Sequence, residues 1–233
     1  MPRNNAGVFL WDFLYVISKE VYMSMNTETA MNKEMSRRGG VNVNLRRLTG
    51  CAMLAAAANV LMFLEFPIPL MPPFIKMDFS ELPALIAAFA YGPAAGVILC
   101  LVKNLIHLVN TQTGGVGELS NFILGAVFVF TAGIIYKKKH NKRGAVIGSL
   151  AGALVMGLVS LVTNYYIVYP IYTNFMPMEA IIGAYQLIYP GVKDLWGCLL
   201  IFNLPFTVCK GLCSVVITLL IYKKLSPILK GTH

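Results

Sequence analysis

Charge is the property that this sequence has least of. Only 12% of its 233 residues are charged, whereas a typical soluble domain carries about 25%. The shortage is greatest for acidic residues, of which there are 10 against 19 basic ones, while hydrophobic residues make up 57% of the chain. With a mean hydropathy of +0.68, this composition excludes an ordinary soluble domain and predicts an integral membrane protein in contact with a lipid bilayer.

The sequence also lacks the common motifs of catalysis and metal binding. Its five cysteines form no CxxC pair, so a metal or redox centre is not indicated. It contains no GxxxxGKS/T, HExxH or GxSxG motif, which are the patterns of nucleotide, zinc-protease and hydrolase sites. The basic residues flank apolar runs instead of forming a basic and aromatic surface, so nucleic acid is not a predicted partner. We therefore expect no metal and no cofactor.

Six apolar segments predict an all-α fold with six transmembrane helices, at 48–66, 79–91, 94–110, 118–136, 144–172 and 195–222. Basic residues precede the first segment, fill 137–143 and follow the last. Because basic loops stay on the cytoplasmic side, both termini are expected in the cytoplasm. Residues 1–44 contain an apolar run too short to span a membrane and are expected to form a cytoplasmic extension. The transmembrane domain is expected at 45–227 and a cytoplasmic tail at 228–233.

Polar side chains interrupt these apolar segments towards their extracellular ends. A charged group at the bilayer centre costs about 2.5–3.5 kcal/mol, so such residues are expected to face a site or water. Lys210, for example, continues a polar stripe with Asn203 and Thr207 on one face of the last segment. We expect one ligand pocket near the extracellular face that gathers Lys76, Asp78, Lys103, Asn104, Asn164, Thr207 and Lys210.

Amide and ammonium groups of this kind suit a flat heteroaromatic ligand with ring carbonyls, because Asn both donates and accepts hydrogen bonds and Lys donates them. This chemistry predicts binding without turnover. A membrane enzyme that uses Asp78, His107 or Glu118 as an acid or base is an alternative of a different class. A stand-alone transporter driven by an ion gradient is another. A binder returns its ligand unaltered, which distinguishes it from an enzyme.

Two segments carry small residues at a spacing of four, a pattern that lets another helix approach closely. Ala52 and Ala56 lie in the first segment, and Gly144, Gly148 and Gly152 lie in the fifth. The alanine pair fits packing within this chain as well as docking onto a separate membrane protein. Because no nucleotide motif explains an energy supply, the two small-residue faces favour an energising partner in the membrane.

Six motifs follow one another in order along the chain: FLEFPIP, FIKMDFSELPALIAAFAYGPAAGV, KNLIH, TGGVGELSNF, NYYIVYPIY and PFTVCKG. As an ordered set they resemble the riboflavin-binding S components of energy-coupling-factor (ECF) transporters, over about residues 48–227. The resemblance implies a subunit of the bacterial plasma membrane that captures riboflavin from outside. Its implied partners are a membrane coupling subunit and two ATPases of the ATP-binding-cassette type. An S component for another vitamin is the nearest alternative.

The resemblance also implies roles for residues of the pocket. It places Asn164 and Lys210 against the isoalloxazine ring, and Lys76 and Asp78 in a lid over the ligand. Where the family usually has PFNxxKG this chain has PFTVCKG. Thr207 therefore stands at an asparagine position, and the choice between riboflavin and FMN or an analogue stays open.

The resemblance implies roles for further residues, which lie in shorter and less specific motifs. Asn104 in KNLIH and Glu118 in GELSNF are weaker members of the implied ligand site. Ala52 and Ala56 match the AxxxA pattern through which such proteins pack on the coupling subunit. In the picture that the family implies, the S component topples in the membrane and carries its pocket to the inner side.

Overall fold

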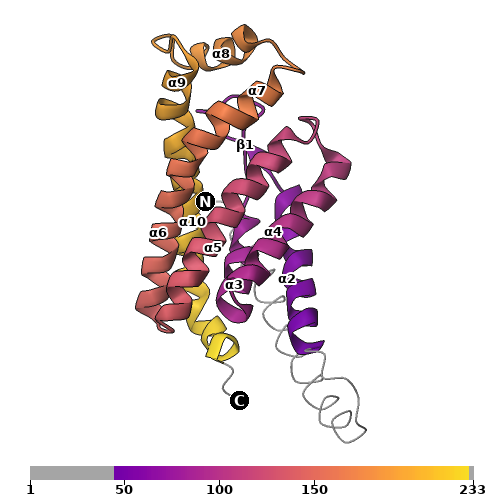
Figure 1. Cartoon of the computed structure of the whole chain (residues 1–233), viewed down its shortest axis with the longest axis vertical. Coiled ribbons are helices and arrows are strands. Elements are labelled where there is room, and N and C mark those ends of the chain that lie inside the picture. Colours follow the sequence, from indigo (N-terminus) through magenta and orange to yellow (C-terminus); the bar gives the residue numbers. More distant parts are fainter. Residues whose placement is uncertain (1–44, 231–233) are drawn as a thin grey trace, which may run out of the picture.

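The computed structural model describes residues 45–230, which form a bundle of helices with one pair of short strands (Figure 1). Its first half contains α2 Leu45–Phe63, β1 Phe66–Pro67, β2 Lys76–Met77, α3 Glu81–Tyr91, α4 Pro93–His107, the 3-10 turn η1 Leu108–Asn110 and α5 Val116–Lys138. Its second half contains α6 Lys142–Thr163, the π turn η2 Asn164–Val168, α7 Tyr169–Tyr172, α8 Met178–Gln186, α9 Leu195–Cys198, the π turn η3 Leu199–Asn203 and α10 Leu204–Lys230. The expected extension at 1–44 lies outside the described residues.

The six predicted apolar segments are all helical, although their ends differ by a few residues. Within the described residues, four helices are long and apolar enough to cross a membrane: Pro93–Asn110, Val116–Lys138, Lys142–Tyr172 and Leu195–Thr218. The apolar helices in α2 and α3 are shorter. The last helix continues to Lys230, past the point where the tail was expected to begin.

The long fifth and sixth helices each contain a π turn, and the sequence explains where. Pro170 and Pro205 each follow the end of a π turn by two residues. A proline inside a helix has no N–H to donate and its ring clashes with the carbonyl of residue i−4. The residue before each proline bonds one position further back instead, Tyr169 N–H to the Asn164 carbonyl and Leu204 N–H to the Leu199 carbonyl. The widened turns relieve the clash and carry an asparagine each.

The glycine face of α6 packs inside the chain. A methyl group added to Gly148 would lie 2.7 Å from the Ala132 carbonyl oxygen, and one added to Gly152 would lie 2.7 Å from the Phe128 carbonyl oxygen. The glycines therefore let the backbones of α5 and α6 approach closely, as small residues do between membrane helices. The expectation that this face serves an energising partner is wrong, because α5 already covers it.

Two features of the connections were not expected from the sequence. The connection between the fifth and sixth predicted segments holds α8, in which Ile181 and Tyr185 are buried one turn apart. The strands β1 and β2 pair antiparallel and fold the segment 64–80 back on itself. The glycine-rich loop before α5 is a turn, with Gly114 and Gly115 at φ of 61° and 88°.

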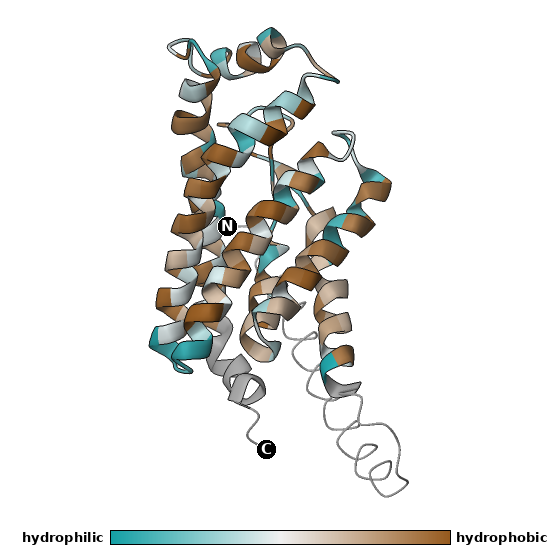
Figure 2. Cartoon of the chain, in the orientation of Figure 1, coloured by the Kyte–Doolittle hydropathy of each residue, from teal (hydrophilic) through white to brown (hydrophobic). Residues whose placement is uncertain are grey.

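The two ends of the bundle differ in character. Figures 1 and 2 show α7, α8 and α9 at one end, the α8 end, and the hydrophilic connection between α5 and α6 at the other. That connection includes residues 137–143, most of which are basic, so we call it the basic end. The sides between them expose large apolar residues at helical spacing, such as Leu154, Leu158 and Val162 on α6. A surface of this kind fits contact with lipid.

Candidate functional site

A cavity of about 650 Å³ lies among the helices and the segment 64–80. Its size falls within the range of about 300–1,000 Å³ that is usual for small-molecule sites. Its apolar wall includes Phe74, Leu124, Met156, Val168 and Phe206. The predicted site residues on its wall are Lys76, Asp78, Glu118, Asn164, Thr207 and Lys210. They come from parts of the chain far apart in sequence, and Asn164 and Lys210 share this one hollow.

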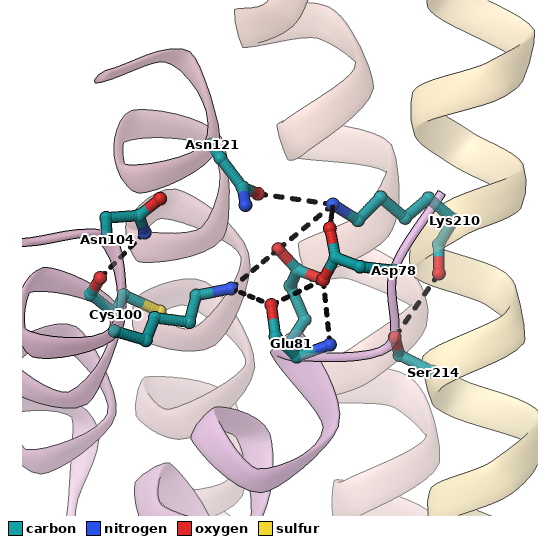
Figure 3. Close-up of polar contacts among 9 residues, drawn as sticks. Asp78, Glu81, Cys100, Asn104, Asn121, Lys210 and Ser214 are labelled. Carbon is teal, nitrogen blue, oxygen red and sulfur yellow. Dashed lines mark hydrogen bonds and ion pairs between the residues drawn. The ribbon is translucent and has the colours of Figure 1, made fainter. Parts of the chain in front are cut away.

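Lys103 and Asn104 were both expected in the pocket, but neither lines the cavity. The Asn104 amide nitrogen donates to the backbone carbonyl of Cys100 at 2.7 Å, within its own helix α4 (Figure 3). The neighbouring residue, Lys103, points elsewhere and is completely buried. Successive helix residues lie about 100° apart around the axis, so the side chains of Lys103 and Asn104 point in different directions.

Lys210 makes three polar contacts at the cavity wall, drawn in Figure 3. Its Nζ lies 2.8 Å from Oδ2 of Asp78, 3.2 Å from Oδ1 of Asn121 and 3.3 Å from Oε1 of Glu81. A lysine ammonium has three N–H donors, so these acceptors occupy all of them. Asn121 was not singled out from the sequence, because nothing in its local pattern indicates a lysine from α10 as its partner.

Lys103 completes a buried group that we call the charge cluster, formed by Asp78, Glu81, Lys103 and Lys210. Lys103 Nζ lies 3.0 Å from Glu81 Oε1 and also contacts the hydroxyl of Ser80, which in turn donates to Asp78. Two ammonium groups face two carboxylates, so the cluster is neutral as a whole. This balance explains how a fully buried lysine is tolerated, since an unpaired buried charge is far more costly.

The two predicted lid residues have different positions. Lys76 is partly exposed and its Nζ lies 2.6 Å from Glu65 Oε1 and 2.7 Å from Gln112 Oε1. It thereby joins the segment 64–80 to the loop before α5. Asp78, two residues on, is buried in the charge cluster. The same segment therefore contributes both to the edge of the cavity and to its charged wall.

Glu118 holds the glycine-rich loop against α4. Its Oε1 lies 2.9 Å from Nδ1 of His107, and its Oε2 accepts hydrogen bonds from Thr111 at 2.9 Å and Thr113 at 3.3 Å. His107 is buried, so this contact lies in the interior of the protein. Both oxygens of Glu118 already have partners within the chain, which is the arrangement of a residue that fixes a loop beside the cavity.

A second polar group lies at the α8 end of the cavity. The Tyr185 hydroxyl donates to Asn203 Oδ1 at 2.6 Å, Asn203 Nδ2 donates to the Tyr169 hydroxyl at 3.1 Å, and the two hydroxyls contact each other. Asn203 and Tyr169 line the cavity. Asn203 was visible in the polar stripe of its helix, whereas Tyr185 was missed because α8 was not foreseen.

Comparisons with known proteins agree with this architecture. The family described as "ECF transporter, substrate-specific component" matches residues 46–222. The riboflavin transporter RibU of Staphylococcus aureus (strain TCH60) is 35% identical over 186 residues, covering 79% of this chain and 93% of the relative. The riboflavin transporter FmnP of Bacillus subtilis (strain 168) is 32% identical over 188 residues, covering 79% and 94%.

A solved structure supports the same relationship. Described as the S component of a bacterial ECF transporter, it is 34% identical, covers 81% of this chain and 99% of its own, and superposes with a TM-score of 0.64. The match leaves out less than a fifth of this chain. This membrane protein therefore belongs to the substrate-specific (S) components of ECF transporters, a family of transport proteins and not of enzymes.

Proposed function

We propose that the protein captures riboflavin in the cavity and delivers it to the cell as part of an ECF transporter. The observation that carries this proposal is the meeting of Asn164, Thr207 and Lys210, from two long helices, on the wall of one cavity of about 650 Å³. The family and the names of the relatives support the choice of ligand.

The wall offers what a flat heteroaromatic ring requires. Apolar side chains such as Phe74 and Phe206 provide faces for the ring, while amide and ammonium groups meet its carbonyls and ring nitrogens. Because the three N–H groups of Lys210 already have acceptors, a ring carbonyl at Lys210 takes the place of a weaker contact. Glu81 at 3.3 Å and Asn121 at 3.2 Å are the two longer ones. Asp78 keeps its ion pair in this arrangement.

The proposed topology has six transmembrane helices, with the α8 end extracellular and the basic end cytoplasmic. The basic connection Lys137–Arg143 supports this orientation through the positive-inside rule. The helices α2 and α3 are shorter than the other four spans. Because α3 is buried over residues 81–89, it is surrounded by protein. The cavity then opens towards the side from which the vitamin arrives.

For docking we propose α2 as the surface that meets the membrane coupling subunit, which in turn contacts two ATPases. Ala52 and Ala56 are exposed on α2, whereas Leu54 and Ala58 on the same helix are buried. Ala52→Trp or Ala56→Trp is therefore expected to leave ligand binding intact and to abolish uptake in cells that contain the coupling module. Leu154→Trp, on the exposed side of α6, is the matched control, and normal uptake by the α2 variants contradicts this docking surface.

Riboflavin fluorescence tests the proposed function directly. Purified protein in detergent is expected to quench the fluorescence at a ratio of one ligand per chain at submicromolar concentration. A parallel titration with FMN addresses the ligand choice that Thr207 leaves open. Absence of quenching at micromolar concentrations of folded protein, with a different molecule co-purifying, overturns the assignment to riboflavin.

A further inference from the structure

One carboxylate of the cavity wall has no ammonium partner. Among the described residues, four carboxylates and two lysines line the cavity: Glu65, Asp78, Glu81, Glu118, Lys76 and Lys210. The first three of these carboxylates each pair with a lysine, at 2.6, 2.8 and 3.0 Å respectively. Within the same residues, Glu118 forms an ion-pair contact with His107 alone. The charge of Glu118 is therefore balanced only if the His107 ring is protonated.

The hydrogen bonds around Glu118 are those of an ionised carboxylate. The Thr111 hydroxyl accepts from the backbone N–H of Gly115 at 2.9 Å and donates its own proton to Glu118 Oε2 at 2.9 Å. Nδ1 of His107 lies 2.9 Å from the other oxygen. An ionised carboxylate can only accept hydrogen bonds, so the His107 ring carries a proton on Nδ1.

The second ring nitrogen of His107 decides the charge of the pair. Nε2 is buried and has no hydrogen-bond partner among the described residues. A protonated ring would have an N–H at this position without an acceptor, and an unmade hydrogen bond costs more for a charged group than for a neutral one. The contacts therefore favour a neutral ring, which leaves the negative charge of Glu118 unbalanced at the cavity wall.

Two helices place this charge one turn from the charge cluster. On α4, His107 follows Lys103 of the cluster by four residues. On α5, Glu118 precedes Asn121, which contacts Lys210, by three residues. Residues at these offsets share a helix face, and three or four residues span about 5–6 Å. A ligand that binds beside Lys210 and extends towards the loop before α5 therefore passes Glu118.

We propose that the cavity selects flavins with an uncharged side chain against flavin phosphates, and that Glu118 is the specificity-determining residue. The proposal rests on the proposed function, because it takes the flavin ring to bind at Asn164 and Lys210. The chain of riboflavin ends in a neutral hydroxyl, whereas that of FMN ends in a phosphate with about two negative charges. Like charges repel strongly in a site of low dielectric constant, and both lysines of the described wall already pair with carboxylates.

The test compares riboflavin, FMN and riboflavin 5′-acetate, a neutral ester, by fluorescence quenching with the full-length protein. The unmodified protein is expected to bind riboflavin about 100-fold more tightly than FMN, and the acetate within about tenfold of riboflavin. Glu118→Gln is expected to reduce the preference for riboflavin over FMN by about tenfold, because it removes the charge and keeps the size of the side chain. Glu179→Gln, which alters an exposed carboxylate of α8 outside the cavity wall, is the matched control and should leave the preference unchanged.

Glu65→Gln provides a second route to the same answer, should Glu118→Gln fail to fold. Glu65 is partly exposed, and its replacement releases Lys76 from an ion pair at the cavity edge, so the preference is expected to fall by about two- to fivefold. A preference that is unchanged in both variants overturns the proposal, as do equal affinities of the unmodified protein for riboflavin and FMN. An acetate that binds as weakly as FMN also overturns it, because the cavity would then read size and not charge. If the unmodified protein binds none of the three flavins, the proposed function itself has failed, which is a separate outcome.

Discussion

The basic end and the α8 end of the molecule differ in their buried cores. The core around α3 is mainly aliphatic and contains several small residues, including Ala84, Ala87 and Ala88. The core towards α8 contains Tyr169 and Tyr185 beside Val, Ile and Leu side chains. Small residues let helix backbones approach closely, whereas the tyrosines bring hydroxyl groups to the cavity, which Tyr169 lines. The first region is therefore a packed scaffold, and the second forms part of the cavity wall.

The charge cluster lies where these regions meet. Glu81 is the first residue of α3, and the next residues of that helix, Leu82 and Ala84, belong to the aliphatic core. On the other side, Asp78, Glu81 and Lys210 face the cavity. One neutral group of ions thus supports the scaffold and forms part of the ligand site. The predictions below separate these two contributions.

The largest expected effect concerns stability at this junction. Lys103→Met leaves two buried carboxylates facing a single lysine, and is expected to destabilise the protein by about 3–5 kcal/mol. The measurement is thermal or chemical unfolding of the purified protein in detergent. The double variant Lys103→Met/Glu81→Gln restores neutrality and is expected to recover most of the loss. A double variant as unstable as the single one would show that charge balance is not what the cluster supplies.

The next prediction addresses the scaffold. Gly152→Val places a side chain against the Phe128 carbonyl and is expected to cost about 1–3 kcal/mol of stability by overpacking. Riboflavin affinity of the folded fraction should stay unchanged, because Gly152 does not line the cavity. Gly183→Val in α8 is the control, since a methyl group there meets no atom within 4 Å. Equal destabilisation by both variants contradicts the packing argument.

The cavity should respond in the opposite way. Asn164→Ala is expected to weaken riboflavin binding by about 10- to 100-fold while changing the unfolding temperature little, because the Asn164 amide faces the cavity and makes one long contact, 3.5 Å, with Ser120. Asn104→Ala removes the same chemical group outside the cavity and should leave affinity unchanged. Affinity lost equally in the two variants would place the ligand elsewhere.

Much of the fold was predictable because the apolar runs are long. Hydrophobic length alone located the six helical segments, and basic residues gave their proposed orientation. The helix α8 was not predicted, because it is only nine residues long and its apolar residues are equally compatible with a loop. Pro170 and Pro205 were visible in the sequence, but whether a proline gives a kink, an end or a π turn depends on the neighbouring helices.

The sequence predicted which polar residues form the site, but it did not predict which residues they contact. Polar residues in apolar helices must face something polar, and this rule found Asn164, Thr207 and Lys210. Their partners come from distant segments, for example Asp78 beside Lys210 at a separation of 132 residues, which no local pattern reveals. The rule also grouped Lys103 and Asn104 with the site, although neither lines the cavity and the Asn104 amide nitrogen donates within its own helix.

The smallest expected effect is at the edge of the cavity, where Lys76 joins Glu65 and Gln112. Partly exposed ion pairs contribute about 0.2–1 kcal/mol, so Lys76→Met should change riboflavin affinity by less than about fivefold. Both the association and the dissociation rate should rise, because the contact holds the segment 64–80 to the loop before α5 and opening breaks it. Stopped-flow quenching measures both rates, with Lys193→Met, an exposed lysine after α8, as the control. Unchanged rates would mean that the ligand enters without parting these two segments.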